Sequence, residues 1–361
     1  MAEAKIVHSV SYHNKTCYSR ESRNPGAVPA KAGNQYLKIW IPPYQVRGKL
    51  SPARNDKLCK TFVVAYRIML AFSIFLAPLN SFGAETIKFR YLQSIYFDDK
   101  GGGLKQSEGV ACDEKSLLIV GDTGNDRLVR YTFQDKDLKG GNEIKIPQLS
   151  NPIRVQINSK GEIFALDGKK RRIIRLNPDG TFKDYVDGEG IPSPSTFVPK
   201  SFKIDRNNNI HILDIFTGRV LVLNPEGKYQ KQIPFPNDHG FFSDLSVDSR
   251  GIILLIDCVK AMIFSAAKDS NSFSALTKSL REYVDFPTSI TNSKGTIYIV
   301  DEDGGSIILL RGDGTFAGRQ LGKGRSEGLL YFPSQISVNE KGEIFIADRS
   351  NSRVQIFTLV K

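Results

Sequence analysis

The chain contains little cysteine and little histidine, and both shortages exclude common kinds of site. Of its 361 residues, four are cysteine and four are histidine. Only Cys112 and Cys258 lie after residue 84, which is too few for a disulfide framework. His211 and His239 are the only histidines in the same part, so no histidine cluster is present to hold zinc.

A long apolar run is also lacking. The longest, IMLAFSIFLAPL at 68–79, is too short to span a bilayer comfortably, but it follows basic residues and precedes small ones, as the core of a secretory signal does. We therefore expect 57–84 to be a signal peptide and the protein to be exported to the periplasm or the extracellular space. The alternative is an uncleaved membrane anchor over 61–79, which would make the protein the sensor domain of an anchored receptor.

Little net charge lies outside the N-terminal segment. The whole chain has a net charge of +12, but residues 1–84 hold 12 basic and three acidic residues, whereas 85–361 hold 38 basic and 35 acidic ones. The second part is nearly neutral, which argues against nucleic acid as a partner. Residues 1–56 show no helical or strand period, so we interpret them as a disordered extension or as sequence upstream of the true translation start.

What the sequence does contain is an internal repeat. An apolar run, an Asp, a short polar turn and a second apolar run recur six times, as in IFIADRSNSRVQIF at 344–357. The six aspartates are 43 to 47 residues apart: Asp122, Asp167, Asp214, Asp257, Asp301 and Asp348. Five residues after them stand Arg127, Arg172, Arg219, Met262, Ser306 and Arg353.

Each repeat has the elements of four short strands. An alternating run and a Gly or Asn turn precede the Asp-containing pair, as in VQINSKGE at 155–162, and a weaker extended segment follows. Four strands in about 45 residues are the signature of a propeller blade. The sequence therefore predicts an all-β fold over 85–361, with six four-stranded blades.

The repeats resemble those of the NHL-repeat β-propellers. The shared pattern is a Pro, an apolar strand, a Gly turn, I-Y/F-I-A-D, a polar linker and R-V/I-x-x-F, matched most fully at 333–357 and well at 152–176. The last repeat stops after its third strand, while TIKFRYLQSIYF at 86–97 has no place in the first. We expect this N-terminal segment to complete the sixth blade and close the ring.

The recurring charged residues are interpreted as structural. A catalytic group is needed once, whereas a group at every turn usually holds that turn, and Asp side chains accept hydrogen bonds from the backbone of such turns. We expect each Asp to do this and the Arg five residues on to bridge the turn or the neighbouring blade. His211, three residues before Asp214, occupies a packing position, and we expect it to be buried and hydrogen-bonded.

Two features are candidates for binding. A basic turn contains Lys169, Lys170 and Arg171; some NHL propellers bind RNA through basic surfaces, but a solvated turn is the favoured interpretation. The second candidate is the mouth of the central channel, where polar groups would converge. The residues expected there, just before each innermost strand, are Gly109, Arg154, Ser201, Asp244, Ser289 and Gln335.

The sequence assigns no catalytic residue. The favoured function is a binding or scaffolding module for a protein, a glycan or a small molecule. The alternative is a propeller enzyme of the lactonase or hydrolase kind with calcium or magnesium in the channel, for which Asp244 and Gln335 are the nearest ligands. Neither a resident metal nor another cofactor is otherwise indicated.

Overall fold

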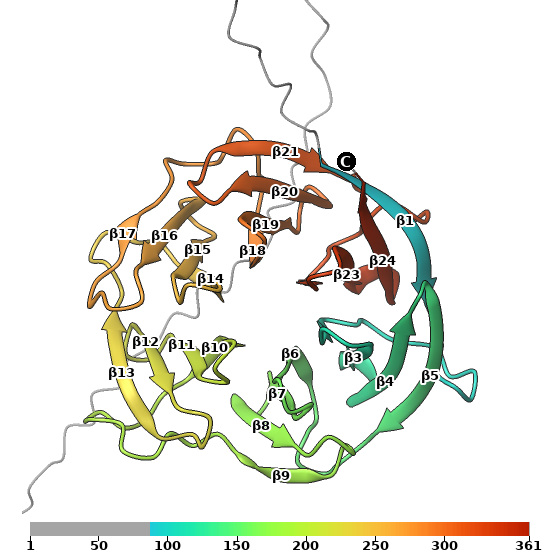
Figure 1. Cartoon of the computed structure of the whole chain (residues 1–361), viewed down its shortest axis with the longest axis horizontal. Coiled ribbons are helices and arrows are strands. Elements are labelled where there is room, and N and C mark those ends of the chain that lie inside the picture. The colour runs from blue at the N-terminus through green and yellow to red at the C-terminus, as the bar shows by residue number, and fades with distance from the viewer. Residues whose placement is uncertain (1–86, 361) are drawn as a thin grey trace, which may run out of the picture. The chain divides into compact units, whose positions relative to one another are not determined.

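The computed structural model describes residues 87–360, which form six four-stranded antiparallel sheets around a central axis (Figure 1). The predicted six-bladed all-β propeller is confirmed. The predicted segments 1–56 and 57–84 lie outside the described residues. Within 87–360, no helix has the length and apolar character needed to cross a membrane.

The strands of blades 1 to 5 run outward from the axis in chain order, whereas the outermost strand of blade 6 is the N-terminal strand. Blade 1 comprises β2 (Gly109–Cys112), β3 (Leu117–Asp122), β4 (Arg127–Gln134) and β5 (Asp137–Ile144). Blade 2 comprises β6 (Pro152–Ile157), β7 (Ile163–Asp167), β8 (Arg172–Leu176) and β9 (Phe182–Tyr185). Blade 3 comprises β10 (Pro199–Ile204), β11 (Ile210–Asp214), β12 (Arg219–Leu223) and β13 (Tyr229–Pro234). Blade 4 comprises β14 (Phe242–Val247), β15 (Ile253–Asp257), β16 (Met262–Ala266) and β17 (Ser274–Ala275). Blade 5 comprises β18 (Pro287–Ser293), β19 (Thr296–Asp301), β20 (Ser306–Arg311) and β21 (Phe316–Gln320). Blade 6 comprises β22 (Gln335–Val338), β23 (Glu343–Asp348), β24 (Arg353–Val360) and β1 (Lys88–Ile95). Two short 3-10 turns, η1 (Thr123–Asn125) and η2 (Arg349–Asn351), follow β3 and β23.

In blades 2 to 6, the turn between the first two strands contains a residue with positive φ. In blade 2, Gly161 has a φ of +79° and its N–H donates to the carbonyl of Asn158 at 3.0 Å. Blade 3 uses Asn208 at the equivalent place, with a φ of +64°. Glycine and asparagine adopt this left-handed conformation most readily, so the polar turns of the repeat become tight hairpins.

The core lies between the blades rather than within any one of them. The second strand is buried over its whole length in blades 2, 3 and 4. One cluster joins Phe164 of blade 2 to Phe202 and Ile212 of blade 3, and similar clusters join the other neighbours. Burying one such side chain contributes about 1.5–3 kcal/mol, so the blades stabilise one another.

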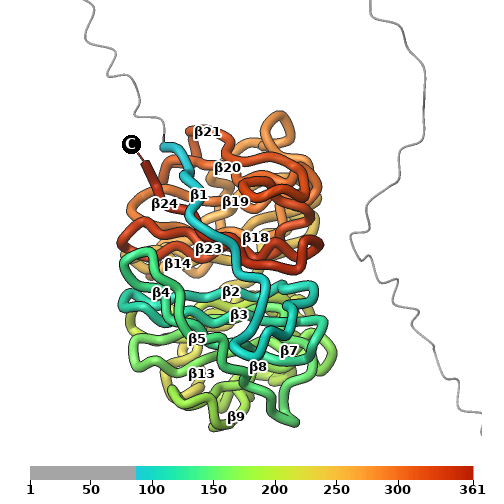
Figure 2. Tube along the Cα trace, turned by 90° about the vertical axis from the view of Figure 1, so that its right-hand side faces the viewer, coloured from blue at the N-terminus to red at the C-terminus, as the bar shows by residue number. Residues whose placement is uncertain are grey.

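The ring closes through the N-terminal strand. β1 pairs antiparallel with β24, from Lys88 opposite Val360 to Ile95 opposite Val354, and it becomes the outermost strand of blade 6 (Figures 1 and 2). The ring of Tyr91 packs edge-on against Phe357 with centroids 5.8 Å apart. The predicted closure is therefore confirmed.

Candidate binding site at one end of the axis

The six repeated aspartates are all fully buried, and each accepts hydrogen bonds from two directions. In blade 2, Asp167 accepts from the N–H and hydroxyl of Ser150 at 2.8 and 2.9 Å, and from the N–H groups of Lys169 and Lys170, both at 2.9 Å. Each Asp thereby ties the loop that enters its blade to the turn that follows its own strand. These backbone and side-chain donors lower the pKa of Asp167 although burial raises it.

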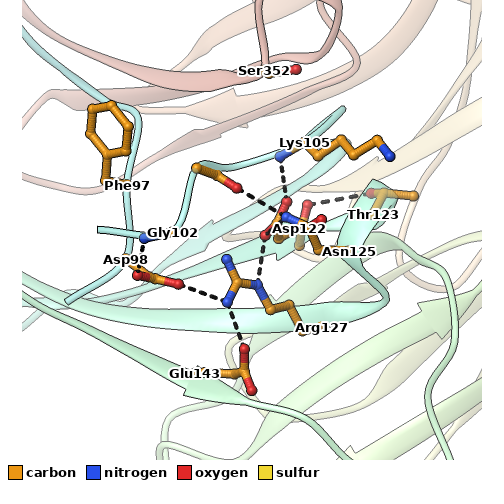
Figure 3. Close-up of polar contacts among 12 residues, drawn as sticks. Phe97, Asp98, Gly102, Lys105, Asp122, Thr123, Asn125, Arg127, Glu143 and Ser352 are labelled. Atoms are coloured by element: carbon orange, nitrogen blue, oxygen red, sulfur yellow. Dashed lines mark hydrogen bonds and ion pairs between the residues drawn. The ribbon is translucent and has the colours of Figure 1, made fainter. Parts of the chain in front are cut away.

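In blade 1 the Asp–Arg pair also holds the closing segment. Arg127 donates to Asp122 at 2.7 Å, to Asp98 at 2.7 Å and to Glu143 at 2.6 Å (Figure 3). Asp98 belongs to the link between β1 and β2, and its carboxylate also accepts from the N–H of Gly102 at 2.7 Å. Arg127 therefore fixes the link that carries the chain from blade 6 into blade 1.

Blade 6 holds the same link from the other side. Arg353 donates to Asp348 at 2.7 Å and to the hydroxyl of Tyr96 at 3.0 Å. Its remaining nitrogen donates to the carbonyls of Ser326 and Leu329 at 2.8 and 2.9 Å. This buried guanidinium is fully used in holding the turn and the ring closure.

The other four blades depart from this pattern in different ways. Arg219 still contacts its Asp214 at 3.2 Å, but Arg172 bonds Asp187 at 2.8 Å and lies 3.7 Å above the ring of Tyr185 instead of reaching Asp167. In blade 4, where Met262 replaces Arg, Asp257 accepts four backbone N–H groups. In blade 5, Asp301 accepts from the hydroxyl of Ser306 at 3.3 Å and from Arg319 of the outermost strand at 3.4 Å.

The predicted channel-mouth residues form one ring, but they lie inside the innermost strands rather than before them. Each residue of the ring pairs with the residue directly before the repeated Asp of its own blade, for example Asp244 with Ile256. In blades 2 to 5 the innermost strand begins two residues earlier than expected and passes through a bulge, as between Pro152 and Arg154. The side chains of the ring are consequently buried, with 0 to 9% of their surface exposed: Arg154, Ser201, Asp244, Ser289 and Gln335.

Most of this ring is hydrogen-bonded to itself. Asp244 accepts from the hydroxyls of Ser201 and Ser289 at 2.5 and 2.7 Å and from the N–H groups of Leu245 and Ile290, both at 2.9 Å. These bonds link blades 3, 4 and 5. A metal at Asp244 would have to displace them, and no group of three or more His, Cys, Asp or Glu in 87–360 is arranged to hold a metal.

Gln335 joins the other three blades. Its amide oxygen accepts from the N–H groups of Val110 and Val155 at 3.2 and 3.3 Å, and its amide nitrogen donates to the carbonyl of Val155 at 3.1 Å. It reaches blade 2 because blade 1 contributes only Gly109 here, where an added Cβ would lie 2.7 Å from the Val155 side chain. Gln335 is therefore committed to backbone groups.

Several polar groups near this end of the axis have no such partner. Among the described residues, the buried side-chain atoms without a hydrogen bond include Arg154 Nε, Thr288 Oγ1 and Ser107 Oγ. The Glu108 carboxylate, one residue before the ring, has no hydrogen bond or ion pair within the described part of the chain, and its pKa is raised by burial against the pull of Arg349 and Arg154. Buried polar groups normally find partners, so the three buried atoms mark a place where a partner is missing, and the half-buried Glu108 carboxylate adds a fourth group without a partner.

The rim above this ring is divided in character. The residues directly after the repeated aspartates are Glu302 in blade 5 and Arg349 in blade 6, which form an ion pair at 2.5 Å. At the same place in blade 3 lies Ile215, followed by Phe216, which is 57% exposed; in blade 4, Val259 is 50% exposed. The rim is therefore charged over blades 5 and 6 and apolar over blades 3 and 4.

The basic turn of blade 2 is largely occupied by local contacts. Lys169 pairs with Asp126 at 3.0 Å, and Lys170 donates to the carbonyls of Pro147 and Gln148 at 3.0 and 2.9 Å. Arg171 lines a cavity of about 200 Å³ with Arg172, Asp187 and Phe197, among others. The turn therefore braces blade 1 against blade 2, and only its last residue faces a cavity.

The remaining candidates for chemistry are placed as packing residues. His211 is buried and its Nε2 lies 3.0 Å from the Asp205 carboxylate. Burial raises the pKa of the Cys112 thiol to about 12, so it is not a thiolate at neutral pH. The letters GRSEG at 324–328 match a nucleophile-elbow motif, but they lie in the loop between β21 and β22 and not at a strand-to-helix turn.

Two contributors to the site were missed by the sequence interpretation, Glu108 and Lys203. Lys203 interrupts an apolar strand in SFKID, two residues after Ser201, so alternation places both on the axis-facing side of β10. That alternation was the available signal for Lys203. No signal in the sequence pointed to Glu108, because its position depends on how blades 1, 2 and 6 meet.

The comparisons with known proteins agree with the fold. The NHL repeat model matches residues 330–357. No curated protein matches the chain. Among solved structures, virginiamycin B lyase from Staphylococcus aureus is similar with 14% identity and a TM-score of 0.53, covering 76% of this chain and 100% of that one. A gluconolactonase from Xanthomonas campestris is similar with 13% identity and a TM-score of 0.55, covering 76% and 89%. A chain of the nidogen–laminin complex is similar with 15% identity and a TM-score of 0.51, covering 69% and 98%.

A six-bladed propeller with its ring closed by the N-terminal strand is thus the class that the fold defines. Residues 330–357 match the NHL repeat, and the six blades agree with the architecture that the NHL-repeat resemblance implies. The similar structures include a lyase, a gluconolactonase and a nidogen–laminin complex, and at these identities they show the fold alone.

Proposed function

We propose that the protein is a binding module that takes up a small polar ligand at the end of the axis where the Asp turns lie. The carrying observation is that the unpartnered polar groups Arg154 Nε, Thr288 Oγ1, Ser107 Oγ and the Glu108 carboxylate all belong to residues at the start of innermost strands or in the loops leading into them. Leaving a buried polar group without a partner costs about 1–3 kcal/mol, so a ligand that supplies the partners gains affinity. These groups come from blades 1, 2 and 5, so a single ligand between them would be held from several sides.

The rim indicates what else the ligand carries. Ile215, Phe216 and Val259 offer apolar surface next to the charged pair of Glu302 and Arg349. A molecule with a charged or hydrogen-bonding end toward the axis and an apolar part over blades 3 and 4 matches both. Sites of this kind combine apolar walls with a few placed polar groups.

A ligand screen on the full chain tests this proposal. Sugars, hydroxy acids, amino acids and nucleotides are tested for a rise in the melting temperature (Tm), and each active compound is then titrated calorimetrically. We expect Glu108→Gln and Arg349→Gln to weaken binding of that compound at least tenfold, or about 1.4 kcal/mol.

The matched control is Lys139→Gln on the outermost strand β5, where the side chain is solvated. We expect it to bind with unchanged affinity. Compounds that bind equally well to all three variants would place the site elsewhere, and a screen without any stabilising compound would also contradict the proposal.

We further propose that the propeller acts outside the cytoplasm, because a signal-like segment precedes it in the sequence. Mass spectrometry of the N-terminus of the protein made in a bacterial host tests this point. A mature chain beginning near residue 84 is expected, whereas an intact residue 60 would contradict cleavage.

A further inference from the structure

Two basic side chains lie at the axis without an anion bonded to either. Arg154 of β6 is 9% exposed and Lys203 of β10 is 8% exposed. One nitrogen of Arg154 donates to the carbonyl of Ile153 at 2.9 Å, but its Nε has no partner. Among residues 87–360, no hydrogen bond or ion pair is formed by the Lys203 ammonium.

Both side chains lie at the same part of the axis. Arg154 belongs to the ring that includes Ser201, and Lys203 follows Ser201 by two residues on the same face of β10. Burial lowers the pKa of Lys203; Asp244 opposes this effect and the Arg154 charge adds to it. The two cations are thus near enough to repel each other.

No acidic side chain of the described residues neutralises this pair by contact. Asp244 is the nearest candidate, but its two oxygens already accept four hydrogen bonds from blades 3, 4 and 5. The Glu108 carboxylate lies one residue before the ring and forms no ion pair with either cation. A buried cation without a partner is costly, so an anion from outside the chain would be bound strongly.

We propose that Arg154 and Lys203 bind the carboxylate group of a small ligand. The inference rests on the proposed function and names the charged end of its ligand. A carboxylate can accept from the free Arg154 Nε with one oxygen and face the Lys203 ammonium with the other. A phosphate carries more negative charge than a carboxylate and would bring it close to Asp244 and Glu108. The two cations do not outweigh this additional repulsion.

Acetate is the probe for this site. The Tm of the full chain is measured in acetate, phosphate and chloride at one ionic strength. In acetate we expect the wild-type Tm to rise with the logarithm of concentration above Kd, and to rise more than in phosphate or chloride. Lys203→Met, which keeps the length of the side chain, removes a buried charge; it should melt higher than the wild type without acetate and lose the response to acetate.

Two control variants on the basic turn, Lys170→Met and Arg171→Gln, change the same net charge outside the axis and should keep the full response. An equal response to acetate in Lys203→Met and the wild type would overturn the inference, as would no response in the wild type. A larger response to phosphate would overturn the assignment to a carboxylate. Arg154→Gln should also lose the response to acetate. If Arg154→Gln does not fold, the result for Lys203→Met decides whether the carboxylate site exists.

The outcome is separable from that of the ligand screen. A compound whose binding depends on Glu108 and Arg349, in a protein that ignores acetate, would overturn the carboxylate site and leave the proposed function in place. An acetate response that needs Lys203, with no screened compound bound, would support the carboxylate site and contradict the proposed function.

Discussion

The Asp turns and the end of the axis use charged side chains in opposite ways. At the turns of blades 1 and 6, the Asp and Arg are saturated: Arg353 alone donates to Asp348, Tyr96 and two carbonyls. At the axis, Arg154 and Lys203 are almost as deeply buried, yet Arg154 Nε and the Lys203 ammonium lack partners. The repeated charges hold the propeller together, whereas these two basic groups at the axis are left available.

The largest effect should come from a saturated turn. Asp348→Ala would leave the Arg353 guanidinium buried without its carboxylate, and we expect it to lower the free energy of unfolding by about 3–5 kcal/mol. Urea denaturation measures this. The matched control is Arg172→Gln, whose partially exposed side chain misses its Asp, and it should stay within about 0.5 kcal/mol of the wild type. Equal losses in the two variants would remove the distinction between them.

A smaller loss is expected at the self-bonded part of the ring. Asp244→Ala leaves two hydroxyls and two N–H groups in blades 3 to 5 without their acceptor, so we expect a loss of about 1–3 kcal/mol in urea denaturation. Ser246→Ala, two residues further along β14, serves as the control because the Ser246 side chain is not part of the Asp244 network. A variant at Asp244 that is as stable as the wild type would show that the network does not hold these blades.

Chelation should have no effect on stability. Because the oxygens of Asp244 and the amide of Gln335 are committed to protein groups, we expect the same Tm with and without EDTA. A fall in Tm that calcium or magnesium reverses, and that Asp244→Asn abolishes, would instead support the lactonase-like alternative.

The smallest effect should be the pH dependence that Glu108 contributes. Burial raises its pKa in the folded protein above the ordinary value, so the folded state binds more protons than the unfolded state between the two pKa values. Stability should therefore fall slightly as pH rises through that window. Glu108→Gln should melt slightly higher than the wild type at pH 7 and equally at a pH below the ordinary value, as measured by Tm across pH. A variant that melts lower at pH 7 would show that the carboxylate has a stabilising partner.

The fold was predictable because every blade repeats the same local information. The spacing of the six aspartates gave the blade number, and 86–97 was recognisable as the closing strand because it had no role in the first repeat. The members of the ring from Gly109 to Gln335 could be named from the sequence because they occupy one position in each repeat, and their role in ligand binding stays a prediction. The predicted depth of the ring was wrong because the bulges at residues such as Pro152 and Arg154 leave no mark in the sequence pattern.

The site was harder to predict because it depends on differences between blades that meet in space. The sequence does not show that Asp244 would be saturated by Ser201 and Ser289, or that Gln335 would pass over Gly109 to reach blade 2. Nor does it show that Arg154 Nε would be left without a partner. These outcomes follow from which six residues share one ring, and only the three-dimensional arrangement gives that.

A crystal structure of the full chain with the compound selected by the ligand screen tests the central claim most directly. The account predicts that the compound lies at the end of the axis, with an acceptor within hydrogen-bonding distance of Arg154 Nε and its charged group facing Lys203. A compound in the cavity beside Arg171 and Phe197, with ordered water bonded to Arg154 and Thr288, would contradict it.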